Sequence, residues 1–143
     1  MNASTEHPNA ALLRRAYTDF DYMFENCSED IVVHPQGTTG LGKGDVVGKA
    51  NFIRRCEEMK RLSDDSLSEP VELVVANDHF GASFARFQVQ RGSDELDIPI
   101  CGIWRFSDGL LVEHWELCAD WPAVERFFGT QVDLEGESTP AAS

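Results

Sequence analysis

Apolar residues in the first half of the chain recur at the three- and four-residue spacing of helices. Pro8 suits a first helical turn, and the spacing after it predicts a helix that continues to Phe20. A second short helix is predicted over residues 21–26, and a longer one over residues 50–62. Between them, residues 31–34 are a β-branched run that predicts a strand. Residues 35–45 hold four glycines, which indicates a loop.

After residue 70 the spacing changes to the alternation of β-strands. The pattern predicts four strands joined by short, hairpin-type connectors, over residues 71–77, 79–90, 95–106 and 110–119. A last helical segment is predicted over residues 120–128. Helices followed by an antiparallel meander indicate an α+β fold, in which a curved sheet and helices enclose an apolar pocket. The 143 residues suit a single domain, with an ordered core at about 8–129 and a disordered tail at 130–143.

Alternation along the strands divides the side chains between the two faces of the sheet. We expect one side of the last strand to face the pocket; it carries His114, Glu116 and Cys118, and Asp120 continues it. A second set of side chains, Phe84, Arg86 and Gln88, should meet the first set there. An arginine buried among aromatic side chains needs a partner, which Asp120 or Glu116 would supply. This pair is either structural or a catalytic acid beside a positioned carboxylate.

Other candidate residues have two interpretations each. His114 takes part in acid–base chemistry or only forms a hydrogen bond across the sheet. Cys118 is a reactive thiol or, like the other three cysteines, a reduced and mostly buried apolar residue. Histidines 34, 79 and 114 could be combined into a metal site, but their spacing matches no ligand motif. Phosphate-binding, dinucleotide-binding and metalloprotease motifs are absent from the sequence, so we expect no metal and no cofactor.

Charge narrows the range of partners. The chain carries 25 acidic and 12 basic residues, a net charge of −13, and such a surface repels nucleic acids and anionic membranes. No apolar stretch approaches the roughly 20 residues of a spanning helix, and the first residues do not resemble a secretion signal, so we expect a cytoplasmic protein. Leu111, Trp115 and Leu117 would form an apolar patch on the convex face of the sheet. This patch predicts a homodimer through that face.

The segments IVVHPQG (residues 31–37) and GIWRFSDGLLVEHWE (residues 102–116), in this order of elements, resemble the nuclear transport factor 2-like superfamily. That superfamily includes ketosteroid isomerases, SnoaL-like polyketide cyclases and limonene epoxide hydrolases. The resemblance covers roughly residues 8–128. It implies a cone-shaped, mixed curved sheet wrapped around the N-terminal helices and enclosing a pocket.

The resemblance also implies site residues. His34 is similar to the proton-shuttling aspartate of the isomerases and Tyr17 to their oxyanion-binding tyrosine, whereas Gly102 stands where their second oxyanion donor would be. Arg86 and Asp120 match two members of the epoxide-hydrolase trio, but Gln88 replaces the third. Asp120 and His114 are similar to the acid–base Asp and the nearby His of the SnoaL-like cyclases.

These features lead to one hypothesis. The chain would be a cofactor-independent acid–base enzyme, a cyclase, isomerase or dehydratase, for a small apolar carbonyl-containing metabolite such as a polyketide-type intermediate. His34 would act as base, Asp120 as acid beside Arg86, and Tyr17 as oxyanion donor. The substrate would contact Trp104, Phe84, Gln88, Phe52 and Glu116. The alternatives are a non-catalytic ligand-binding or assembly module, and an epoxide-opening enzyme that uses Asp120 and Arg86.

Overall fold

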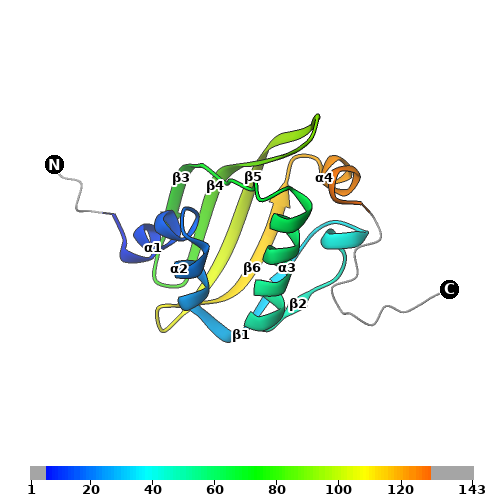
Figure 1. Ribbon diagram of the computed structural model, residues 1–143. Helices are drawn as coiled ribbons and strands as arrows, with labels where there is room; N and C mark the ends of the chain where they lie inside the picture. The colour runs from blue at the N-terminus through cyan, green and yellow to red at the C-terminus, as the bar shows by residue number, and fades with distance from the viewer. Residues whose placement is uncertain (1–5, 130–143) are drawn as a thin grey trace.

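A curved mixed sheet with helices against one face forms the framework of the molecule (Figure 1). The structure is a computed structural model that describes residues 6–129. The helices are α1 (Pro8–Ala16), α2 (Phe20–Glu25), α3 (Lys49–Leu62) and α4 (Trp121–Phe128), with a short 3-10 turn, η2 (Gly40–Gly42). The strands are β1 (Cys27–His34), β2 (Val46–Val47), β3 (Val71–Ala76), β4 (Phe80–Arg91), β5 (Asp94–Ser107) and β6 (Leu110–Cys118).

The strands lie in the order β2-β1-β6-β5-β4-β3. The meander β3-β4-β5-β6 is antiparallel, as its hairpin residues predict, and β1 joins it by parallel pairing with β6. At the turn between β5 and β6, Asp108 and Gly109 both have positive φ, which fits the right-handed twist of the hairpin. The predicted α+β fold with a mixed sheet is confirmed.

Two elements differ from the sequence prediction. The first helix ends at Ala16 and does not continue to Phe20, because Asp19 adopts an extended backbone and caps α2 by accepting a hydrogen bond from the Tyr22 N–H. The first strand begins at Cys27, before the β-branched run, and its register with β6 shifts between Cys27 and Val32. The polar residues 28–30 lie in this irregular stretch, so they do not alternate as a regular strand would.

The side chains of β4 face the opposite way from the prediction. Ala85, Phe87 and Val89 are buried against the helices, so Phe84, Arg86 and Gln88 point outward. The expected burial of these three residues in the pocket is therefore wrong. Both faces of β4 carry a phenylalanine, so alternation alone does not identify the inner face.

In β6, the expected inner set is correct, since His114, Glu116 and Cys118 point toward the helices. Leu111 is fully buried, however, and does not belong to the outer patch. The register between β5 and β6 shifts beside Arg105, which turns Leu111 inward.

The core lies between the concave face and the helices. Leu13 of α1, Ile31 and Val33 of β1 and Trp104 of β5 are at most 1% exposed. Within residues 6–129, no helix is both long and apolar enough to cross a membrane. The tail predicted as disordered, residues 130–143, lies outside the described residues.

Candidate active site

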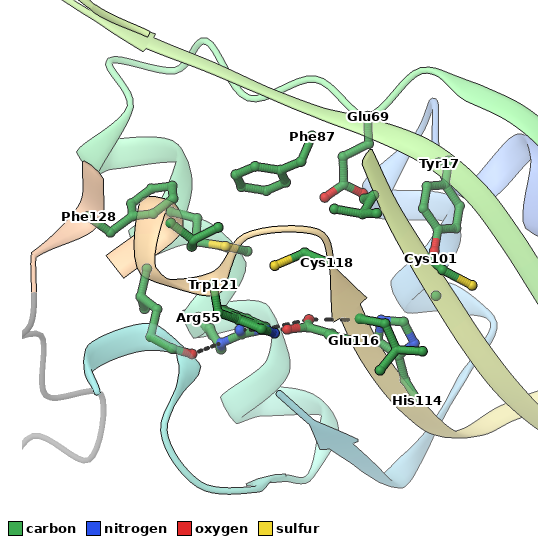
Figure 2. Close-up of a pocket in the computed structure, with 16 residues that line it drawn as sticks. Tyr17, Arg55, Glu69, Phe87, Cys101, His114, Glu116, Cys118, Trp121 and Phe128 are labelled. Atoms are coloured by element: carbon green, nitrogen blue, oxygen red, sulfur yellow. Dashed lines mark hydrogen bonds and ion pairs between the residues drawn. The ribbon is translucent and has the colours of Figure 1, made fainter. Parts of the chain in front are cut away.

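A cavity lies between the inner face of the sheet, α3 and α4, and has a volume of about 580 Å³ with its open mouth included (Figure 2). Its apolar wall includes Leu41, Met59, Phe87, Ile100, Val124 and Phe128. Its polar groups are Tyr17, Arg55, Glu69, His114 and Glu116. Few polar groups in an apolar wall are typical of a ligand site.

Tyr17 is placed in the cavity by the end of α1, as the sequence predicts. The Ser83 hydroxyl and the Trp104 indole N–H both donate hydrogen bonds to its oxygen, at 2.6 and 3.1 Å. The phenolic hydrogen is therefore left for another acceptor. Burial, aided by the negative charges of Glu69 and Glu116, raises the pKa of Tyr17, so the group remains a donor.

Gly102 supplies the space that this arrangement needs. A Cβ atom at position 102 would overlap the Tyr17 oxygen and would lie 2.9 Å from both the His114 Cε1 and the Trp104 Nε1 atoms. The rings of Tyr17, His114 and Trp104 therefore leave no room for a side chain at position 102. This explains why the second oxyanion donor of the ketosteroid isomerases, which would stand at this position, is missing.

His114 is neutral and has one ring nitrogen fixed. Its Nδ1 atom lies 3.1 Å from the carbonyl oxygen of Ile103 and donates to it, and the ring stacks on Trp104 with centroids 3.5 Å apart. Burial lowers the pKa of His114 to about 4 although the charge of Glu116 opposes the shift. The Nε2 atom, 3.8 Å from Glu116, keeps its lone pair. The sequence interpretation of a bond across the sheet is correct, and it leaves Nε2 available for chemistry.

Arg55 and Glu116 form a buried ion pair in the cavity wall. Two guanidinium nitrogens donate to the two carboxylate oxygens at 2.8 and 2.7 Å, and the third donates to the Leu41 carbonyl at 2.9 Å. Burial alone would raise the pKa of Glu116, but the charge and hydrogen bonds of Arg55 outweigh it and lower that pKa. The sequence analysis missed Arg55, although it lies on the buried side of α3 with Phe52, Cys56 and Met59.

Glu69 was also missed, because it lies in the loop before β3. Its neighbour Ser68 pairs with Gln88 through two main-chain hydrogen bonds of 3.0 and 2.9 Å, and strand-like alternation then turns Glu69 inward. The residue is partly exposed, and its carboxyl group points into the cavity (Figure 2). Among the described residues it has no hydrogen-bond or ion-pair partner. Burial, followed by the charge of Glu116, raises the pKa of Glu69 to about 8, with Arg55 opposing the shift.

Helix α4 covers one side of the cavity and is held there by the glycine-rich loop. The carboxylate of Glu125 accepts hydrogen bonds from the Thr38 and Thr39 N–H groups at 2.8 and 2.9 Å. Trp121 packs directly on this loop, since a Cβ atom on Gly42 would lie 2.9 Å from its ring. The loop thus fixes the position of the cavity wall.

His34 and Asp120 lie outside the cavity, contrary to the prediction. Val33 takes the inner face of β1, so His34 points outward, with its ring nitrogens 2.6 Å from Glu113 and 2.9 Å from Asp45. Burial would lower the pKa of His34, but these two carboxylates outweigh it and raise the pKa. Asp120 is exposed and caps α4 by accepting from the Ala123 N–H. Capping satisfies the first turn of α4 and turns the carboxylate of Asp120 away from the cavity.

The expected pair between Arg86 and Asp120 does not form. Arg86 binds Asp97 on the outer face, at 2.9 Å, and Gln88 lies beside the same carboxylate. The epoxide-hydrolase arrangement is therefore not assembled.

Four of the five expected substrate contacts have other positions, and one of them, Gln88, lies beside Asp97 on the outer face as described above. Trp104 and Phe52 are buried next to His114 and support its ring, with the Phe52 centroid 6.4 Å away. Phe84 is 42% exposed on the outer face. Of the predicted contacts, Glu116 lines the cavity.

The cysteines are free thiols. Cys101 and Cys118 border the cavity, and burial raises the pKa of each, which favours the protonated thiol. Within the described residues, no three His, Cys, Asp or Glu side chains are grouped as metal ligands.

Comparison with known proteins identifies related sequences and folds. Residues 10–114 match the family described as the SnoaL-like domain. Bal32a, from a soil-derived mobile gene cassette, is 21% identical with a TM-score of 0.78, covering 85% of this chain and 96% of its own. A protein from Jannaschia sp. CCS1, described as a candidate SnoaL-like polyketide cyclase, is 15% identical with a TM-score of 0.70, covering 90% and 96%.

IdmH from Streptomyces antibioticus, a candidate polyketide cyclase, is 19% identical with a TM-score of 0.62, covering 78% of this chain and 92% of its own. These structural likenesses show the fold. Comparison with the curated proteins gives no match.

Proposed function

The chain belongs to the SnoaL-like domain family, and we propose that it is a cofactor-independent acid–base enzyme for a small, apolar, carbonyl-containing metabolite. The observation that carries this proposal is the unpaired carboxyl group of Glu69, which shares an apolar cavity with neutral His114. A polyketide-type substrate and a cyclisation are the finer proposal, supported by the descriptions of two structural neighbours. An isomerase or a dehydratase would use the same groups.

The two groups have opposite pKa shifts, which is how one site holds an acid and a base at the same pH. Glu69, with a pKa raised to about 8, keeps its proton and donates it to the substrate carbonyl oxygen. The Nε2 atom of His114 accepts the proton from the adjacent carbon, and the C–H electron pair moves into the enol double bond. Tyr17 donates a hydrogen bond to the oxygen as negative charge develops there. The enol carbon then attacks a second carbonyl, whose oxygen takes the proton from His114, or the enol takes up that proton at another carbon; in both cases the first carbonyl oxygen returns its proton to Glu69.

Deuterium exchange tests this chemistry without knowledge of the substrate. Acetophenone, 2-tetralone and 2-acetylcyclohexanone in D₂O near neutral pD are followed by NMR for deuterium at the carbon next to the carbonyl. We expect wild-type protein to accelerate exchange, and Glu69→Gln to lose about tenfold or more of the acceleration, because an amide does not transfer the proton.

The matched control is Glu72→Gln, an exposed glutamate on β3 that should exchange like wild type. Equal acceleration by Glu69→Gln, or none by any protein, would contradict the acid–base role. Ligand binding without exchange would favour the alternative of a non-catalytic binding module.

We also propose that two copies associate through the outer face of the sheet. Phe80, Phe84 and Leu117 are 49, 42 and 39% exposed there, and Phe80 and Leu117 border a shallow groove with Trp115. Sedimentation should detect a dimer at micromolar concentration, and Phe84→Glu should shift it toward monomer. Leu110→Glu, at the exposed first residue of β6, is the control. A wild-type monomer at this concentration would refute the dimer.

A further inference from the structure

We infer that the cavity selects uncharged ligands over anions, and that a ligand acceptor oxygen receives a hydrogen bond from the carboxyl group of Glu69. This inference rests on the proposed function only in taking the same cavity as the ligand site. It concerns which chemical class binds, and it holds whether or not a reaction follows.

The first support is the state of the cavity's arginine. All three nitrogens of the Arg55 guanidinium are engaged, two by Glu116 and one by the Leu41 carbonyl, and the side chain is 2% exposed. Of the described residues that line the cavity, Arg55 is the one permanent cation, and its charge is already balanced. An anionic ligand would have to displace Glu116 and leave that carboxylate buried without a partner.

The second support is the surroundings of Glu69. Glu116 on β6 presents a like charge, which Arg55 on α3 offsets, and Tyr17, His114 and the thiol of Cys56 are uncharged neighbours. The thiol of Cys118, which borders the cavity, is protonated as well. The remainder of the wall is apolar and includes Phe87. A carboxyl group in this setting retains its proton near neutral pH.

The third step follows from hydrogen-bond chemistry. A protonated carboxyl group is a donor, and its hydrogen bond to a ligand acceptor contributes to binding when the ligand displaces water from the cavity. A carbonyl oxygen meets this need, whereas a hydrocarbon leaves the donor unpaired. A carboxylate ligand would add a second negative charge beside that of Glu116. The acceptor also stabilises the protonated form of Glu69, so binding at pH 8 takes up protons from solution.

Three probes of similar shape distinguish a neutral ligand with an acceptor oxygen, an anion and a hydrocarbon. They are 2-acetylnaphthalene (neutral acceptor), 2-naphthoate (anion) and 2-ethylnaphthalene (no acceptor). Affinities are measured by titration at pH 7. Proton uptake is measured by calorimetry at pH 8 in phosphate and in Tris, whose ionisation enthalpies differ. We expect the ketone to bind at least about tenfold more tightly than either other probe, a difference of about 1.4 kcal/mol. Its binding should take up a fraction of a proton, since part of Glu69 is ionised at pH 8.

The variants locate the effect. Glu69→Gln keeps a neutral donor, so it should bind the ketone within a few-fold of wild type but without proton uptake. Glu72→Gln should behave as wild type. Naphthoate binding as tightly as the ketone, ketone binding without proton uptake, or no binding of any probe would overturn the inference. Ketone binding with proton uptake but without deuterium exchange would refute the proposed function alone.

Discussion

Replacing Glu116 with glutamine is expected to lower the free energy of unfolding by about 3–5 kcal/mol, because it leaves the Arg55 charge buried without a counter-charge. Arg55 is 2% exposed, and the glutamine amide satisfies some of its hydrogen bonds but none of its charge. Urea denaturation at pH 7 would measure the change. The loss should appear as a lower midpoint with little change in slope.

The matched control is Glu113→Gln on the outer face of the same strand, where the carboxylate is 24% exposed and binds Arg105 and His34. Its loss should be about 1 kcal/mol. The double variant Arg55→Met with Glu116→Leu should be more stable than Glu116→Gln alone, since apolar side chains of similar volume replace the whole pair. A loss below about 1 kcal/mol for Glu116→Gln would mean that water reaches and solvates Arg55.

The Glu69→Gln variant is expected to gain stability relative to wild type as the pH rises from about 4.5 to 8. Folding raises the pKa of Glu69 to about 8, so in this window the native state binds more protons than the unfolded chain. The free energy of unfolding of the wild type therefore includes a contribution from Glu69 that decreases as the pH rises and is constant above pH 8. Glutamine does not titrate, so the variant lacks this contribution. At pH 8 the difference should reach about 3 kcal/mol, allowing for solvent at the cavity mouth.

Urea denaturation of both proteins at intervals from pH 4.5 to 9 checks this, with Glu72→Gln as the exposed control. His114, whose pKa is lowered to about 4, makes stability rise between pH 4 and 6.5, but it is present in both proteins and cancels in the difference. A difference that does not change with pH would show that Glu69 ionises as in water.

The sequence predicts the order of elements well because the signals for it are local. Turn residues such as Asp108 and Gly109 and the alternation in β3 to β6 determine the meander without reference to the remainder of the chain. The inner face of β4 depends on what packs against it. Phe84 and Phe87 are equivalent in the sequence, and only the helices make one of them internal.

The residues of the candidate site, too, are predicted correctly where local signals place them and missed where packing places them. Tyr17, His114 and Glu116 were expected in the cavity and line it. Arg55 and Glu69 were not expected, since one comes from a helix whose buried side was assumed to be apolar, and the other from a loop oriented by the Ser68–Gln88 pairing. His34 and Asp120 match positions in related families, but the alternation of β1 and the cap of α4 turn them away.

The parallel pairing of β1 with β6 has a consequence for synthesis on the ribosome. Residues 27–34 are made early, yet their neighbour in the sheet, residues 110–118, is among the last parts of the fold to emerge. Until then, the first strand has only β2 beside it, and the growing chain carries an open β-edge that favours association with other nascent chains. Such a distant contact also slows folding, since a long loop must close before the pairing forms.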